Sequence, residues 1–453
     1  MTIKTVLIFT LVLAVKPCFT QTCDCRDIII ESINLVEKNY AGFKEKTIDN
    51  NNKRYSKIKK KALHDSKSRK NECIEILNSY LSFFKDPHLI LVENKSKLIV
   101  TTLLKTTGQT QNKKTTVLGF WNSGLHGAKI WVSKKKGVYS GHITSSSDTA
   151  YKPGTLVYKF KQTGKNNYYG LVYNKYGQKL FYEFVLRDSM LMIKSLENLT
   201  RNQIVNTKND DFRFVNLNDS VCYLNFPSFS YYYKKMCDSI VTTNRDIIEK
   251  SKYLVVDIRN NGGGSIYSFY KLFNYIYTGP TNYVSGYYLA SEDHISRETK
   301  TLEKIKKDKD TSGLADQEYL VEQLNKNKGG FYYQQLEQLT RDKVFSTPSI
   351  VVFLTNDGTA SAAEMLLIMA KQNSKTIIAG VNTDGAADFL EPQFYYLCNK
   401  RFVIGIPWIK RSRFEYKENI DGIGISPDIN LEYIEESKWV NYLFEKGLIY
   451  QKK

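Results

Sequence analysis

The spacing of hydrophobic and polar positions predicts two helices and a strand near the start of the chain. Apolar residues recur at helical spacing in residues 24–43 and again in residues 69–84, with a lysine-rich connection between them. The second helix must end at the sequence KDPH, because the residue before a proline is pushed out of helical geometry. The apolar run LILV then begins a strand. The pattern therefore places His88 in a rigid corner between a helix and a strand.

The pattern changes twice more along the chain, and each change marks a domain. In residues 97–205, short β-rich runs such as KIWVSK and KLFYEFVL are separated by turn residues, which is typical of a sandwich or barrel. In residues 206–453 strands and helices alternate, as in an α/β layered domain, and a charged helical insertion interrupts them at about 293–343. We therefore expect an N-terminal helical segment at 21–96, an inserted all-β module and an α/β core.

The first 20 residues have the layout of a secretory signal. A lysine is followed by the apolar run Val6–Val15 and then by small or polar residues. This run is too short to span a membrane, and no later run is long enough. We expect residues 1–20 to be removed, so that the mature chain begins at Gln21 and is exported to the periplasm or the extracellular space. A lipid anchor on Cys18 is the weaker alternative, because small residues do not precede it.

Composition excludes some classes of partner. The chain has 453 residues, of which 42% are hydrophobic, and such a length suggests two or three domains. Its net charge of +19 is dispersed, and the lysine runs KIKKK and KKK are not interleaved with aromatic stacking residues. We therefore expect a solvated lysine-rich surface and no nucleic-acid partner. Nothing in the sequence indicates an oligomeric state.

Six cysteines remain after the expected cleavage. The sequence CDC resembles a metal-binding pair, but no second Cys/His pair at zinc spacing accompanies it. An oxidising compartment favours a disulfide instead. Because the two N-terminal helices start beside Cys25 and near Cys73, we predict that Cys73 is bonded to Cys25, or else to Cys23. The apolar surroundings of Cys222 and Cys237 predict buried thiols. No metal or cofactor is expected.

The segment NDGTASAAE places a hydroxyl between a strand and a helix. It follows the apolar run SIVVFL and precedes the helical sequence MLLIMAKQN, with Ser361 among small residues that let another backbone approach. A helix N-terminus offers unpaired N–H groups and the positive end of a dipole. This corner suits a nucleophile with an anion-stabilising pocket. It also suits an ordinary helix cap, because serine is a usual capping residue, and this segment alone favours the cap.

A second motif, YLVVDIRNNGGGS, ends a strand in glycines whose N–H groups can form an anion-binding nest. Together, and in this order, the two motifs resemble the C-terminal processing (tail-specific) serine peptidases. The resemblance covers residues 212–292 and 344–435, and also FFKDPHLIL near the N-terminus. It implies a crotonase-like (ClpP/crotonase type) α/β fold, protein or peptide substrates and Ser361 as the nucleophile. The N–H groups of Gly263 and Ala362 would form the oxyanion hole.

The chain departs from that family at the catalytic base. Processing peptidases pair their serine with a lysine in a GKG sequence, whereas TDGAADF here puts Ala386 at that position. Lys371 is no substitute. It lies so far along the same predicted helix that its Cα would be roughly 15 Å from that of Ser361.

A histidine can replace the missing lysine. The chain is similar to the tricorn-like branch of the family, which uses a histidine from a DxH corner and an acid before a GxxPD tail. The matching sequences here are DPHL, with His88, and IDGIGISPD, with Asp421. The resemblance implies His88 as the base and Asp421 as the residue that fixes its tautomer, with Glu418 as the alternative acid. That branch has a serine before its histidine, where this chain has Pro87.

Two hypotheses follow. The first is a secreted serine endopeptidase with a histidine base, and the co-occurrence of His88, Ser361, the glycine nest and an acid favours it. The second is a catalytically inactive peptide- or ligand-binding protein on the same fold, as retinoid-binding relatives show is possible, and the loss of the lysine favours that. The β module lacks the GLGF-like carboxylate loop of the PDZ domain that processing peptidases usually carry.

Overall fold

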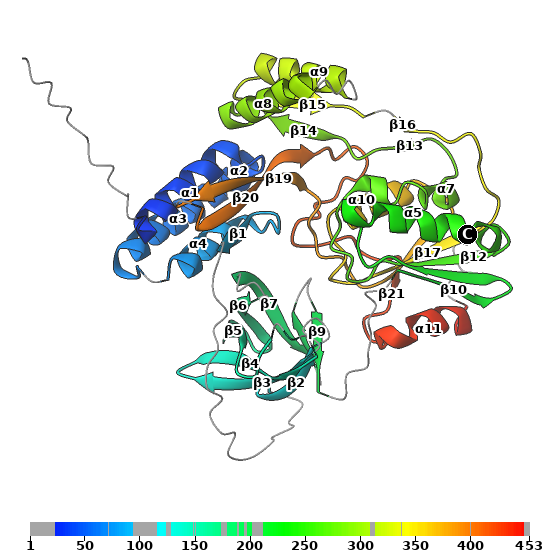
Figure 1. Ribbon diagram of the computed structural model, residues 1–453, viewed down its shortest axis with the longest axis horizontal. Helices are drawn as coiled ribbons and strands as arrows, with labels where there is room; N and C mark the ends of the chain where they lie inside the picture. Colours follow the sequence, from blue (N-terminus) through cyan, green and yellow to red (C-terminus); the bar gives the residue numbers. More distant parts are fainter. Residues whose placement is uncertain are drawn as a thin grey trace, which may run out of the picture.

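The computed structural model describes residues 23–70, 72–93, 116–123, 128–147, 149, 151–173, 179–187, 190–193, 197–201, 212–308, 313–336, 338–398 and 400–447. The predicted signal peptide at 1–20 and the start at Gln21 lie outside these residues. One mixed sheet and one antiparallel sheet, both with flanking helices, and one closed barrel make up most of the fold (Figure 1). The α/β character expected of the core is confirmed.

The first sheet has six strands and forms the centre of the core. Its strands, in spatial order, are β10 (Arg213–Asn218), β11 (Val221–Asn225), β12 (Tyr253–Asp257), β17 (Ile350–Thr355), β18 (Thr376–Gly380) and β21 (Ile429–Asn430). β10 is antiparallel to its neighbour, and the other five strands are parallel. Parallel strands are covered on both faces, which explains why these segments are almost continuously apolar.

Helices cover both faces of this sheet. On one face lie α5 (Lys234–Thr243), α6 (Arg245–Ile248), α7 (Phe273–Ile276) and α10 (Ala362–Ala370), which share a core cluster with alternate strand residues such as Leu254 and Phe353. On the other face α11 (Trp439–Glu445) packs Trp439 against the intervening residues Val255 and Val352 (Figure 1). Each strand therefore sends successive side chains to opposite cores, as the period of a strand requires.

The second sheet joins the N-terminal helices to the core. It consists of β1 (Ile90–Glu93), β20 (Phe402–Arg411), β14 (Gly286–Leu289) and β15 (Phe331–Gln334), with β19 (Phe389–Leu397) also paired to β20. Against it pack α1 (Cys25–Asn39), α2 (Phe43–Thr47), α3 (Asn50–Ser68) and α4 (Cys73–Leu81), followed by the 3-10 turn η1 (Ser82–Phe84). Because β1 pairs with β20, the N-terminal segment is attached to the core through this sheet.

The lysine-rich connection between the two expected helices is itself the helix α3. It buries Tyr55, Ala62 and Ser66 at helical spacing. The lysines occupy the remaining positions, where their long side chains reach water. The interpretation as a linker was wrong because charge density obscured this narrow apolar stripe.

The strands between β1 and β10 form a closed antiparallel barrel. In order they are β2 (Gly119–Ser123), β3 (Ala128–Lys135), β4 (Val138–Ser146), β5 (Leu156–Gln162), β6 (Asn167–Tyr173), β7 (Lys179–Arg187), β8 (Met190–Ile193) and β9 (Glu197–Thr200). The barrel has its own core around Trp121, Tyr158 and Phe184. Its residues Leu171 and Tyr173 belong instead to the core of the N-terminal helices, so the barrel is docked on that unit.

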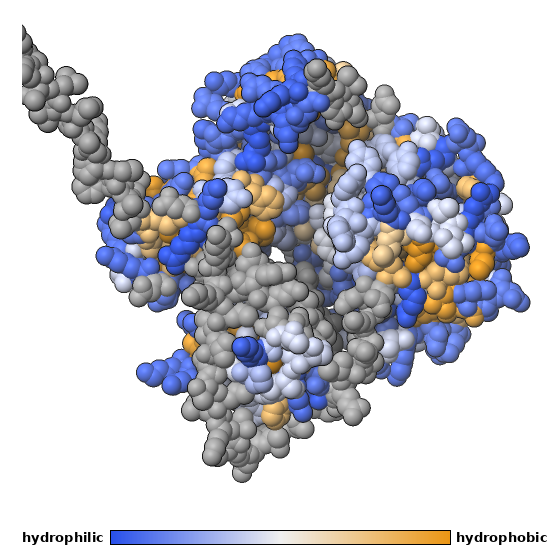
Figure 2. Space-filling model, viewed as in Figure 1, coloured by the Kyte–Doolittle hydropathy of each residue, from blue (hydrophilic) through white to orange (hydrophobic). Residues whose placement is uncertain are grey.

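A helical insertion follows the second sheet's strand β14. It contains α8 (Glu292–Asp308) and α9 (Leu314–Lys326), and β13 (Thr281–Asn282) and β16 (Gln338–Leu339) pair beside it. Its outer surface is hydrophilic (Figure 2). Inside, His294 is buried against Trp408 and its Nδ1 lies 2.8 Å from the Leu289 carbonyl oxygen. Burial lowers the pKa of His294 to about 4.

No helix in the described part of the chain is long and apolar enough to cross a membrane.

The disulfide differs from the predicted one. Cys23 is bonded to Cys398, and their Cα atoms are 5.4 Å apart. Cys25 and Cys73 are free thiols, with Cys73 Sγ 3.5 Å from the Cys25 carbonyl oxygen. The pairing was missed because β19 brings Cys398 to the start of α1, a proximity that only the tertiary fold creates. The predicted buried thiols Cys222 and Cys237 are confirmed.

Candidate active site

Ser361 occupies the turn between strand β17 and helix α10. Its backbone has φ 55° and ψ −119°, a conformation that costs a non-glycine residue free energy and is held only when its surroundings fix it. The glycine segment at 262–264 follows β12, which is the parallel neighbour of β17. Both loops therefore lie at the carboxyl ends of adjacent strands, the edge of a parallel sheet where ligands usually bind.

Glu364 fixes this strained turn. Its carboxylate is fully buried and accepts hydrogen bonds from the backbone N–H groups of Ser361 (2.9 Å), Gly385 (2.8 Å) and Ala386 (2.8 Å), and from the Thr383 hydroxyl. Burial raises the pKa of Glu364 to about 7, while these donors act in the opposite direction. Ala386 stands where the GKG sequence of processing peptidases would have its lysine. Its backbone N–H donates to Glu364 and so helps to support the turn of Ser361.

His88 lies directly opposite the serine. Its Nε2 is 3.2 Å from Ser361 Oγ, and its Nδ1 is 2.7 Å from the Phe389 carbonyl oxygen. Because a carbonyl can only accept, Nδ1 carries the proton and Nε2 of the neutral ring is free to accept from the hydroxyl. The histidine is half-buried, and its backbone N–H donates to Asp86 Oδ1 at 2.8 Å. The structure therefore brings together two residues that are 273 positions apart.

Asp421 does not contact the histidine, contrary to the expectation. Its Oδ1 accepts from the Asp388 N–H at 2.9 Å, and its Oδ2 accepts from Lys46 Nζ at 3.1 Å. Burial, together with the nearby carboxylates of Asp86 and Asp388, raises the pKa of Asp421 well above its ordinary value, and Lys46 opposes this. The Phe389 carbonyl takes the place expected for the acid at His88 Nδ1. The preceding residue, Asp388, is the one that contacts Asp421.

Glu418, the alternative acid, is no closer to that role. Its carboxylate accepts from the Tyr416 hydroxyl at 3.0 Å, and its backbone carbonyl accepts from Arg411. Lys371 caps the far end of α10, with Nζ 3.6 Å from Asp428 Oδ1. The expectation that Lys371 lies away from Ser361 therefore agrees with its place in the fold.

Asp388 is a residue that the sequence reasoning missed. One carboxylate oxygen accepts from Arg411 at 2.6 Å, and the other accepts from the N–H groups of Ile420 (2.7 Å) and Asp421 (2.8 Å). These bonds hold the start of β19 in place and so aim the Phe389 carbonyl at His88. The sequence TDGAADF contained a signal for this role, because its second aspartate, Asp388, directly precedes Phe389.

The glycine segment approaches the serine closely, but not through the donor that was expected. The N–H of Gly263 donates to Asn261 Oδ1 at 2.9 Å and is therefore already engaged. Gly263 has φ +93°, and a Cβ there would lie 2.7 Å from both the Ala360 oxygen and the Ala362 nitrogen. The N–H of Ala362 opens helix α10, at the end that favours negative charge.

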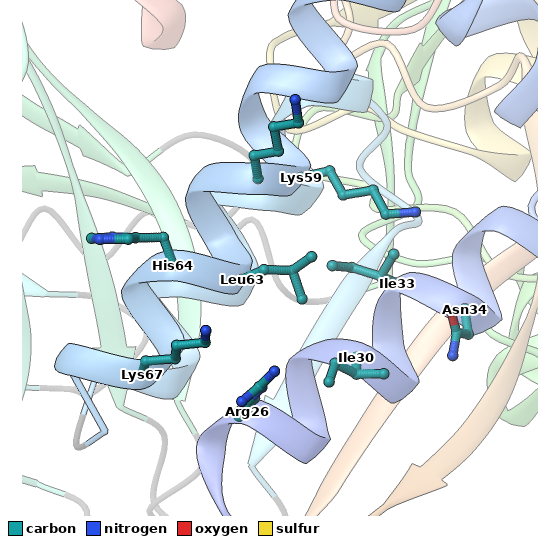
Figure 3. Close-up of a pocket in the computed structure, with 9 residues that line it drawn as sticks. Arg26, Ile30, Ile33, Asn34, Lys59, Leu63, His64 and Lys67 are labelled. Atoms are coloured by element: carbon teal, nitrogen blue, oxygen red, sulfur yellow. The ribbon is translucent and has the colours of Figure 1, made fainter.

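The surface pocket shown in Figure 3 lies elsewhere. It measures ≈ 460 Å³ and is lined by residues of α1 and α3, with Ile30, Ile33 and Leu63 between the two helices and Arg26 and Lys67 at its end. It includes none of the residues around Ser361, so its volume says nothing about the catalytic centre. Within the described residues, no group of three or more His, Cys, Asp or Glu side chains is arranged to hold a metal ion.

Comparisons with known proteins support a peptidase. Residues 220–431, which contain β11 to β21, match Peptidase family S41. No curated protein matches the sequence. Among solved structures, mature CPAF aligns with a TM-score of 0.53 and 12% identity, covering 93% of this chain and 96% of that one. Mature CPAF complexed with lactacystin aligns with a TM-score of 0.54 and 12% identity, covering 94% and 98%.

The class supported by the family match is a serine-type peptidase, a hydrolase that acts on peptide bonds. Within that class, the findings support peptidase family S41 over the matched residues. At 12% identity, the likeness to mature CPAF concerns the fold alone.

Proposed function

We propose that this protein is an exported serine endopeptidase with a crotonase-like core, in which Ser361 is the nucleophile and His88 is the base. The observation that carries the proposal is the pair of contacts of His88, 3.2 Å to Ser361 Oγ and 2.7 Å to the Phe389 carbonyl oxygen. They put the ring within hydrogen-bond reach of the hydroxyl and in the tautomer that can take its proton. No lysine is needed at Ala386.

The reaction uses the groups in sequence. Ser361 Oγ attacks the carbonyl carbon of the scissile bond while its proton passes to His88 Nε2, and the same proton then goes to the leaving amine. The N–H of Ala362 stabilises the oxyanion, and a single such donor is worth about 3 kcal/mol in comparable sites. Water then attacks the acyl carbon while its proton passes to His88 Nε2. The bond from that carbon to Ser361 Oγ breaks, Oγ takes the proton back from His88, and the acid product leaves. The Phe389 carbonyl keeps Nδ1 protonated throughout.

A fluorophosphonate probe tests this function directly. We expect covalent labelling at Ser361, located by peptide mass spectrometry, and hydrolysis of unfolded protein or peptides. Both signals should be absent in Ser361→Ala and retained in Lys371→Ala, which alters an exposed lysine at the far end of the same helix. A wild-type chain that is folded but neither labelled nor active would be the ligand-binding protein of the alternative hypothesis.

We also propose that the protein acts outside the cytoplasm. The Cys23–Cys398 disulfide supports this, because such bonds persist in oxidising compartments. N-terminal sequencing of protein recovered from outside the cytoplasm should begin at Gln21. A mature N-terminus at Met1, or a lipid on Cys18, would contradict the proposal.

A further inference from the structure

Five tyrosines gather on the surface beside the catalytic loops. Three form the 3-10 turn η2 (Tyr231–Tyr233), and two lie in or next to the 3-10 turn η3 (Ile266–Ser268), which contacts it. Tyr231 is 68% exposed, Tyr232 87% and Tyr267 59%, and Tyr233 and Tyr270 are exposed to a lesser degree. We call these five residues the tyrosine surface. Grouped exposed aromatic side chains mark interaction sites in soluble proteins more often than isolated ones do.

Hydrogen bonds connect this surface to the glycine segment of the active site. The Phe229 N–H donates to the Gly263 oxygen at 3.0 Å, and the Ser265 N–H donates to the Phe229 oxygen at 2.8 Å. Two residues after Phe229, the chain enters the turn that carries Tyr231–Tyr233. On the other side, η3 contacts α10, whose first residue follows Ser361. A polypeptide that crosses the serine therefore reaches the tyrosines within a few residues.

The charges around the tyrosine surface restrict what it can bind. Arg341 already stacks on Tyr270, with its guanidinium carbon 3.9 Å from the ring centroid. Lys235, in the first turn of α5 just after η2, and Lys271, shortly after η3, are also exposed. A basic side chain would meet like charges there. An apolar or aromatic side chain would instead bury tyrosine faces at little conformational cost, because a tyrosine has few rotatable bonds.

We propose that the tyrosine surface is the specificity subsite of the peptidase and that it selects an apolar or aromatic side chain within a few residues of the scissile bond. Its occupant is an unfolded segment of the substrate polypeptide. This inference rests on the proposed function, because it needs Ser361 to act on that segment. Tyr232 is the middle residue of η2, and Tyr267 is the middle residue of η3. The proposal assigns to these two exposed rings the contact with the substrate side chain.

Peptides and variants test the subsite. One fluorogenic peptide series carries a single Phe, Ala or Lys at each position around a fixed cleavage site. The protein is tested as wild type, as the double variant Tyr232→Ser with Tyr267→Ser, and as Tyr433→Ser. Tyr433 is 95% exposed and lies in the C-terminal tail, so it is the matched control for loss of an exposed tyrosine. The readouts are kcat/KM, the rate of fluorophosphonate labelling and the mass in solution.

At one position, we expect wild type to prefer Phe over Ala by about tenfold and to disfavour Lys. The double variant should lose about tenfold in kcat/KM for the Phe peptide and less than twofold for the Ala peptide. Its labelling rate should stay within twofold of wild type, because the small probe does not reach the surface. Tyr433→Ser should behave as wild type in all three readouts.

The two possible failures are distinguishable. A wild-type protein that the probe does not label overturns the proposed function and the subsite with it. A labelled protein whose double variant keeps its preference for Phe overturns the subsite alone. The subsite is equally overturned if the double variant changes only the mass in solution, since the tyrosines would then join two copies of the chain.

Discussion

At the scale of single residues, His88 is oriented by a carbonyl oxygen and not by a carboxylate. His88→Ala removes the proton acceptor, so we expect kcat to fall nearly as far as in Ser361→Ala, by about 10⁴-fold or more, because members of such a unit act together. The measurement is peptide hydrolysis at matched thermal stability. As a control, Lys371→Ala should change kcat less than twofold. Full activity in His88→Ala would exclude His88 as the base.

Asp421→Asn separates a direct from an indirect role. An acid bonded to the imidazole would cost about 10⁴-fold in kcat when amidated. Here the side chain contacts the Asp388 N–H and Lys46 instead, so we expect a loss of less than tenfold. Asparagine keeps the oxygen that accepts from Asp388 and loses only the pairing with Lys46. A loss near 10⁴-fold in kcat would mean that Asp421 contacts His88 during turnover.

Glu364→Gln should lower the reactivity of Ser361, although the serine itself is unchanged. Glutamine has one acceptor oxygen for four donors, and its amide hydrogens would face N–H groups of the Ser361 turn and the 383–386 loop. Each buried donor left without an acceptor costs about 1–3 kcal/mol. We therefore expect the labelling rate to fall by tenfold or more. Glu415→Gln, at a part-buried carboxylate that accepts from Ser285, is the control. Equal labelling in both variants would show that the Ser361 turn keeps its conformation without the Glu364 carboxylate.

Glu364 also predicts a pH dependence of stability. Its pKa is about 7 when folded, against an ordinary value of 4.5, so the folded chain holds this proton more firmly. The contribution is present below pH 4.5 and is lost as the pH rises through 7, by roughly 3 kcal/mol in all. Urea unfolding of wild type and Glu364→Gln between pH 5 and pH 8 measures it. The variant should lack this part of the slope, and parallel curves would contradict the assignment.

At the scale of elements, the close approach of two loops depends on one glycine. A Cβ at Gly263 would lie 2.7 Å from the Ala360 oxygen and the Ala362 nitrogen, and φ is +93°. Gly263→Ala should therefore destabilise the fold by about 1–3 kcal/mol and slow labelling of Ser361. The neighbouring Gly262 has open space at its Cβ position, so Gly262→Ala should retain wild-type thermal stability. Identical melting curves for the two variants would contradict the predicted crowding.

The sequence motifs predicted the secondary-structure elements of the site well. They predicted the hydrogen bonds within the site less well. Strand, turn and helix around Ser361 follow from local pattern, and so does the corner that holds His88. The orienting carbonyl could not be predicted, because every residue carries one and only the register of β19 against β20 selects Phe389. The engagement of the Gly263 N–H with Asn261 likewise depends on a side-chain rotamer that no spacing rule fixes.

At the scale of the whole molecule, the barrel comes near the loop that supports the serine. Burial chiefly, and the nearby Asp384 in addition, raise the pKa of Tyr182 in β7. Asp384 itself belongs to the segment whose neighbours Thr383 and Gly385 bond Glu364. The spacing of short strands predicted a β module, whereas the proximity of Tyr182 to Asp384 required the three-dimensional fold.

The final prediction concerns how the N-terminal unit delivers His88. Several contacts hold this unit on the core, among them the pairing of β1 with β20 and the bond from Cys23 to Cys398 at the end of β19. The bond closes a loop of most of the chain, so it should stabilise the docked state by about 2–4 kcal/mol. In Cys398→Ser, the N-terminal unit should separate from the core at a lower temperature than the six-stranded sheet unfolds. Since Ser361 is activated only when His88 is docked, labelling should be lost before the main unfolding transition. Cys73→Ser removes a free thiol and is the control. If labelling and global unfolding coincide in Cys398→Ser as they do in Cys73→Ser, then pairing of β1 with β20 suffices to hold His88 in place.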